Sequence, residues 1–125
     1  PDRLLPAAQA LCERILEPIR VYFRAPVVIH SAYRCPALNR AIGGSKRSQH
    51  VKFEAADFHV VGITLGAVFN WIRFSSRLRY GQVILEGQSA GVPSWVHVSI
   101  GEPFRPRGKS RQALVFDGKR YSAVV

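Results

Sequence analysis

The chain has 125 residues, of which 47% are hydrophobic and 21% are charged, a composition that indicates one globular domain around a single core. Arg, Lys, Pro or Gly interrupts every apolar run before it reaches the about 20 residues of a membrane-spanning helix, so we expect a soluble chain without membrane insertion. Eighteen Lys and Arg against eight Asp and Glu give a formal net charge of +10, which favours anionic partners.

The first half of the chain predicts two helices, a strand and a loop. Apolar residues recur at helical spacing over Leu4–Phe23, which indicates an amphipathic helix. Pro18 must kink or divide this helix, because an interior proline removes a hydrogen bond and clashes with the preceding turn. Residues 26–30 predict a short strand, and residues 36–42 a short helix with a glycine stop. The polar residues 43–52 predict a loop.

The second half predicts a strand, a helix and a terminal hairpin. Residues 55–61 are typical of a strand, and residues 64–74 of a helix that Thr64 caps. Near the end, 113–116 and 120–124 flank an Asp-Gly pair, which is a strong hairpin signal. The chain shows no internal repeat and no linker, so we expect a single α+β domain.

Two alternating segments, residues 82–86 and 95–99, predict a further β-hairpin with Gly and Pro in its turn. We expect Glu86 opposite Trp95, Ile84 opposite His97 and Gln82 opposite Ser99. Side chains alternate between the faces of a strand, so one face is apolar and the other polar. The apolar face carries Val83, Leu85, Val96 and Val98, and the polar face carries Gln82, Glu86, Trp95, His97 and Ser99.

A second polar cluster lies upstream, between Ser48 and Asp57. His50 and Asp57 reach His97 if the chain leaves a loop at His50 and returns as a strand with Asp57 facing the same site. Two imidazoles and one carboxylate with an open fourth position are the ligands of a catalytic zinc site. Taken singly, each histidine is better explained as a loop or core residue. The combined pattern favours a metal site.

These motifs support a family resemblance. Ser48, His50, Ala55 and Asp57 match the pattern S-x-H-x-x-G-x-A-x-D, and Ser31-Ala-Tyr-Arg34 and Trp95-Val-His-Val-Ser99 accompany it. The chain thereby resembles the zinc D-alanyl-D-alanine carboxypeptidases and phage endolysin peptidases, which share their fold with Hedgehog signalling domains. The resemblance covers roughly residues 4–100 of one domain, 1–125. It implies a Hedgehog/DD-peptidase fold, a small antiparallel sheet flanked by helices.

The resemblance also implies an activity. His50, Asp57 and His97 would hold one zinc ion per chain, and Arg34 and Ser48 would line the substrate site. Trp95 is either a wall of that site or a packing residue. The implied reaction is hydrolysis of a peptide bond in the peptidoglycan stem peptide, by a monomer acting in the bacterial cell envelope or by a phage-encoded lytic or virion protein. Anionic wall polymers are then natural partners of the basic chain.

Two positions depart from the family pattern. Phe53 stands where the pattern has glycine, and a glycine there can serve a backbone shape that other residues adopt only at a cost. Ser94 stands where many relatives carry an acid, three positions before the last histidine.

The catalytic base must then come from elsewhere. Elimination leaves Glu86, because the other acids lie on the first helix, in the terminal turn, at the metal or off the predicted face. Arg34 would stabilise negative charge in the reaction.

Two other functions remain open. A zinc-stabilised wall-binding or virion module without turnover is favoured by Phe53 and Ser94. The third possibility is a basic nucleic-acid-binding domain, with small clusters at Lys46-Arg47 and Arg105–Arg111. Against it, the chain has no aromatic-interleaved RNA-binding motif and no zinc-finger cysteine spacing.

Four further residues receive structural interpretations. Cys12 and Cys35 form either one disulfide or two partly buried thiols. His30 and His59 are interpreted as structural.

The sequence contains no Met, so we expect a processed or excised piece, in which a removed signal peptide is not visible.

Overall fold

The computed structural model describes residues 2–45, 48–87, 93–102, 104 and 110–124. The basic pair Lys46-Arg47, most of the basic cluster at 105–111 and the centre of the predicted turn at 88–92 lie outside the described residues. Within the described part, no helix is long and apolar enough to cross a membrane.

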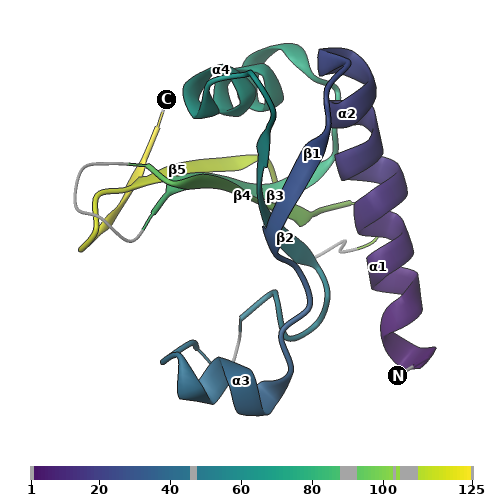
Figure 1. The fold of residues 1–125 in the computed structure, drawn as a ribbon, viewed down its shortest axis with the longest axis vertical. Coiled ribbons are helices and arrows are strands. Elements are labelled where there is room, and N and C mark those ends of the chain that lie inside the picture. The colour runs from purple at the N-terminus through teal and green to yellow at the C-terminus, as the bar shows by residue number, and fades with distance from the viewer. Residues whose placement is uncertain (1, 46–47, 88–92, 103, 105–109, 125) are drawn as a thin grey trace.

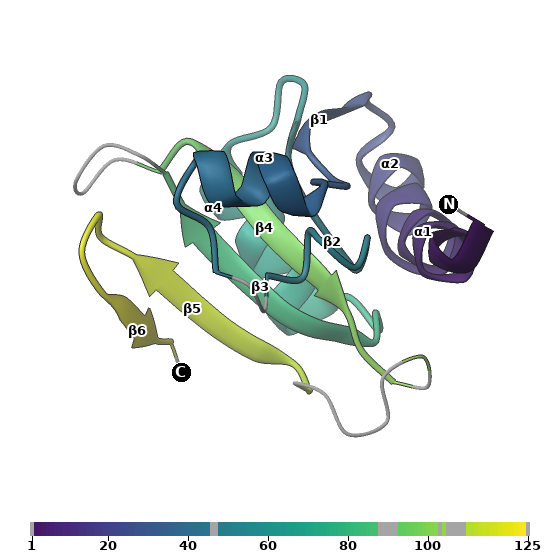
Figure 2. The same cartoon turned by 90° about the horizontal axis from the view of Figure 1, so that it is seen from below.

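The centre of the fold is a six-stranded mixed sheet in the order β1-β2-β4-β3-β5-β6 (Figures 1 and 2). Its strands are β1 (Val27–Ser31), β2 (Ala55–Val60), β3 (Tyr80–Glu86), β4 (Trp95–Ile100), β5 (Gln112–Phe116) and β6 (Tyr121–Ala123). The single α+β domain therefore agrees with the sequence prediction.

One strand pair corrects the expectation of an antiparallel sheet, because β5 runs parallel to β3. The chain leaves β4 beside the start of β3, where the Gly101 N–H donates to the Arg79 carbonyl and the Arg111 N–H to the Tyr80 carbonyl. The terminal hairpin consequently enters at the start of β3 and follows it in the same direction. The other strand pairs are antiparallel.

The N-terminal helix is divided at the predicted place. It consists of a short 3-10 turn (Asp2–Leu4), α1 (Leu5–Leu11), a π-helical segment (Cys12–Leu16) and α2 (Glu17–Phe23). The π segment ends at Leu16, and Pro18 follows in the first turn of α2, where a missing N–H is tolerated. Cys12 and Cys35 are both free and exposed, so no disulfide links this helix to the rest of the fold.

The helices divide the molecule into a core side and a site side. The N-terminal helix packs with α4 (Leu65–Asn70), which Thr64 caps as predicted, and its π-helical extension (Trp71–Ser75) against one face of the sheet. This core includes Leu11, Ile15, Ile19, Val68, Ile72, Val83, Val96 and Val98, each at most 1% exposed. Figure 2 shows α3 (Pro36–Ala41) on the opposite side of the sheet from α4.

The predicted register of the central hairpin is confirmed in the half that carries Glu86 and His97. Glu86 is paired with Trp95, and Ile84 with His97. The ladder is irregular between Tyr80 and Val83, and there the Gln82 N–H donates to the Ser99 hydroxyl over 2.9 Å. Glu86 and His97 consequently share the face opposite the core.

Candidate metal centre

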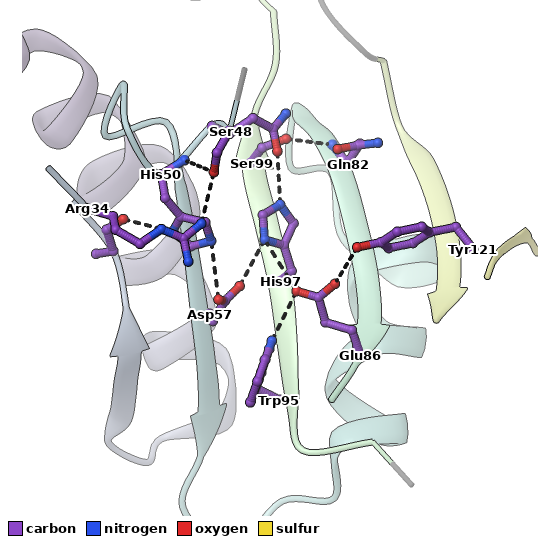
Figure 3. Close-up of polar contacts among 12 residues, drawn as sticks. Arg34, Ser48, His50, Asp57, Gln82, Glu86, Trp95, His97, Ser99 and Tyr121 are labelled. Carbon is purple, nitrogen blue, oxygen red and sulfur yellow. Dashed lines mark hydrogen bonds and ion pairs between the residues drawn. The ribbon is translucent and has the colours of Figure 1, made fainter. Parts of the chain in front are cut away.

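Three buried side chains from separate segments converge on the open face of the sheet (Figure 3). Asp57 on β2 and His97 on β4 are direct partners across the strand pair. His50 comes from the loop before β2, as its sequence position predicts. The Asp57 carboxylate lies 2.9 Å from His97 Nδ1 through Oδ1 and 3.2 Å from His50 Nε2 through Oδ2. One ligand atom from each residue lies within 4.8 Å of the others.

Hydrogen bonds on the outer side of each ring select the nitrogen that faces the carboxylate. His50 Nδ1 lies 2.8 Å from the Ala32 carbonyl, which only accepts, so Nδ1 carries the proton and Nε2 keeps its lone pair. His97 Nε2 lies 2.9 Å from Gln49 Oε1, and the same argument leaves the lone pair on Nδ1. Second partners of this kind orient metal-binding histidines in proteins.

The electrostatics of this cluster fit a cation. In the neutral rings, two lone pairs face the two oxygens of Asp57, an arrangement of acceptors that a proton or metal ion must bridge. Burial raises the pKa of the Asp57 carboxyl, but when the two rings are protonated, hydrogen bonds and charge from His50 and His97 outweigh burial and lower the pKa to about 2. The carboxylate is therefore ionised at neutral pH, as a metal ligand must be.

The loop that carries His50 is fixed by two hydrogen bonds that Arg34, in the segment after β1, donates to it. The Arg34 N–H donates to the His50 carbonyl over 3.1 Å, while an Arg34 guanidinium nitrogen donates to Ser48 Oγ over 3.0 Å. Ser48 Oγ also accepts the His50 N–H over 3.3 Å. Ser48 and Arg34, both predicted at the site, thus also set the position of the histidine.

Phe53 adopts the backbone shape that its place in the motif predicts. Its φ is +59°, in the left-handed region where glycine is favoured. The Phe53 ring stacks on Tyr33, with centroids 5.6 Å apart and an interplanar angle of 23°. The substitution is thereby accommodated, and His50 still meets Asp57.

A cleft of about 600 Å³ opens over the three side chains, and Arg34, Glu86 and Trp95 all line it. Glu86 Oε1 lies 3.9 Å from His97 Nδ1 and accepts a 3.1 Å hydrogen bond from Trp95 Nε1. Ser94 is exposed and does not belong to the cleft lining. Among the described residues of the lining, Asp57 and Glu86 are the two acids.

Three contacts of the site were missed by sequence reasoning. Gln49 lies between the motif residues Ser48 and His50. This position in the motif was the one sequence signal that could have indicated its role. The Ala32 carbonyl is a backbone group, which no side-chain pattern reports. Tyr121 lies on β6, and its hydroxyl is 3.4 Å from Glu86 Oε2, although 35 positions separate the two residues. No local signal in the sequence connects them.

An α+β domain with a buried His-Asp-His cluster under an open cleft is characteristic of a metallohydrolase. A family model described as peptidase M15 matches residues 4–99. The chain therefore belongs to the peptidase M15 family of zinc metallopeptidases, which have the Hedgehog/DD-peptidase fold and act on peptides of the cell wall. A comparison with curated proteins gives no match.

Proposed function

We propose that the protein is a zinc-dependent peptidase that hydrolyses a peptide bond of the peptidoglycan stem peptide, as a carboxypeptidase or an endolysin-type endopeptidase. The observation that carries this proposal is the position of Glu86. Its carboxylate shares one cleft with the His-Asp-His cluster and with the Arg34 guanidinium. A base, a metal-binding set and a cation in one cleft are the components of hydrolysis by a single-metal peptidase.

His50, Asp57 and His97 are the proposed ligands of one zinc ion per chain. Two neutral imidazoles and one carboxylate match the donor set of catalytic zinc sites, which keep a fourth position open. When bound, zinc lowers the pKa of water toward neutrality and polarises a carbonyl oxygen. The residues of the chain then have to move protons and hold the substrate.

Glu86 is the proposed general acid and base. It takes a proton from the attacking water and returns it to the amine nitrogen of the departing product, so that the proton balance closes over one cycle. Its Oε1 atom faces His97 and is held by the Trp95 indole N–H. Trp95 therefore has a role in the proposed site besides forming part of its wall.

Arg34 is the proposed binding group for negative charge. Its Nε atom is buried and has no hydrogen-bond partner among the described residues, while one terminal nitrogen is held by Ser48. A guanidinium fixed in this way suits a peptide carboxylate or the oxyanion that develops during attack. Ser48 would act in substrate binding through its hold on Arg34.

The net charge of +10 supports a setting near the bacterial wall. Stem-peptide carboxylates and anionic wall polymers attract a basic domain and raise its local concentration. We accordingly place the activity in the cell envelope, whether the chain is bacterial or phage-encoded, with the protein acting as a monomer.

One experiment tests activity, bond and metal dependence together. The protein is incubated with purified muropeptides, with and without a chelator, and the products are identified by mass. We expect one peptide bond to be cut, activity to disappear with the chelator and to return with added zinc. A His97→Ala variant is the matched control and should stay inactive after zinc is added. A zinc-loaded parent that cuts no muropeptide would instead identify a wall-binding module without turnover. Binding of nucleic acid that survives metal removal would favour a basic nucleic-acid-binding domain.

A further inference from the structure

The C-terminal hairpin, β5 and β6, lies beyond the residues that the family model matches and still contributes to the cleft. It joins the sheet through the parallel pair β3–β5, in which Ile84 is the partner of Leu114. Leu114 and Tyr121 both line the cleft. The hairpin therefore supplies one wall of a site whose proposed metal ligands all lie within the matched residues.

Tyr121 reaches from this wall to Glu86 (Figure 3). Its hydroxyl donates to Glu86 Oε2 over 3.4 Å, while Trp95 donates to Oε1 over 3.1 Å. Each carboxylate oxygen thus has its own donor, and the two donors come from different strands. The Tyr121 ring is supported by Phe116 across the hairpin, with ring centroids 4.5 Å apart.

A glutamate side chain has several rotatable bonds, and a base must be held close to one geometry to act efficiently. With a single donor, the carboxylate can still rotate about the oxygen that is bound. A second donor on the other oxygen removes that freedom. It leaves Oε1, the oxygen nearer to His97, directed at the metal cluster.

We propose that Tyr121 is a positioning residue for Glu86, which the C-terminal hairpin carries into the active site. The proposal rests on the proposed function, because Glu86 is the general base only if the protein is a peptidase.

The protonation of Tyr121 agrees with this role. Partial burial of the hydroxyl in the cleft, followed by the negative charge of Glu86 and their hydrogen bond, raises the pKa of the Tyr121 phenol above its usual value of 10.0. The hydroxyl therefore keeps its proton at neutral pH and acts as a donor to the carboxylate.

A Tyr121→Phe variant removes the hydroxyl and leaves the ring on Phe116. We expect unchanged zinc content, kcat lower by about tenfold and KM within about twofold of the parent, because the loss falls on the chemical step. Tyr22→Phe is the matched control, since Tyr22 on α2 is 57% exposed against 56% for Tyr121. It should leave both constants unchanged. Equal kcat in Tyr121→Phe and the parent would overturn the proposal.

A second measurement tests the contact without relying on turnover. Tyrosine is labelled with ¹³C at the ring carbon that bears the hydroxyl, the Tyr121 signal is assigned by its loss in Tyr121→Phe, and the phenol is titrated by NMR. We expect the Tyr121 pKa to fall in Glu86→Gln, because the negative charge is gone. An unchanged Tyr121 titration would refute the contact and with it the positioning role. A parent that is inert on every muropeptide would refute the proposed function, whatever the titration shows.

Discussion

Gln49 and His97 are joined by a 2.9 Å hydrogen bond between Oε1 and Nε2, although they lie 48 positions apart. Gln49 immediately precedes His50 in the loop, and His97 lies on β4. The bond therefore ties the loop of one proposed zinc ligand to the ring of another. It also fixes the ring of His97 with Nδ1 toward Asp57.

Removal of the Gln49 acceptor should weaken zinc binding without removing a ligand. For Gln49→Leu we expect an affinity about 10- to 100-fold lower, since partners of metal-binding histidines typically contribute that much. Gln49→Glu retains an acceptor for His97 and should stay closer to the parent. Competition against a chelator of known zinc affinity measures both variants. Parent-like affinity in Gln49→Leu would show that the bond does not orient the ring.

Loss of either histidine of the metal cluster should abolish stoichiometric zinc. We expect about one zinc per chain in the parent and much less in His50→Ala and His97→Ala, because two protein ligands hold zinc poorly. His59→Ala is the control, since His59 is paired with His30 over 2.7 Å on the same sheet. Metal analysis of purified protein decides the matter, and full occupancy in either test variant would exclude the assignment.

The role of Glu86 can be separated from metal binding. Glu86→Gln keeps a side chain of the same size but removes the base, so turnover should fall at least about a hundredfold while zinc content stays unchanged. Zinc and muropeptide hydrolysis are measured in the same preparation. Cleavage at near the parent rate would assign the base to another residue.

The left-handed backbone at Phe53 predicts an unusual order of stabilities. Phe53→Ala and Phe53→Gly both lose the stacking on Tyr33, but only alanine keeps the steric strain at φ +59°. We expect the glycine variant to be more stable than the alanine variant by about 1 kcal/mol. At Ala67 in α4 we expect the opposite order, because glycine disfavours a helix: Ala67→Gly should lower the free energy of unfolding by about 0.5–1 kcal/mol. Urea unfolding compares the free energies, and an equal or inverted pair at position 53 would contradict the strain.

Attraction to the wall should depend on salt. The net charge of +10 favours anionic polymers, and salt screens exposed charges beyond about 8–10 Å at physiological strength. We expect co-sedimentation with cell-wall material to weaken steadily as salt rises through this range. Binding that does not change with salt would assign recognition to the cleft alone.

Local patterns in the sequence were sufficient for the elements and for the central hairpin. Alternation places Glu86 and His97 on one face, and the observed pairs confirm it. The same patterns do not specify which strand lies beside β3, because alternation describes faces and not neighbours. The parallel partner β5 follows instead from the path of the chain after β4.

The part of the candidate site that consists of motif residues could be predicted from the sequence. His50, Asp57 and His97 were identified because they occur together with the Ser31–Arg34 and Trp95–Ser99 motifs in a combination that resembles a known family, and the structure brings them together. Tyr121 was not, since a tyrosine in a terminal hairpin carries no mark of function by itself. Its contact with Glu86 depends on the neighbours of β3, which the sequence alone did not specify.

Because β5 and β6 follow the other strands in the sequence, the cleft is built from two separate stretches of the chain. The cluster of His50, Asp57 and His97 lies wholly within residues 4–99, whereas Leu114 and Tyr121 follow on a hairpin attached to the outer edge of β3. Exchange of that hairpin with Tyr121 retained should change the shape of the cleft and leave every proposed ligand in place. It is therefore a practical position for retargeting the protein by grafting, with zinc content as an internal check that the rest of the domain has folded.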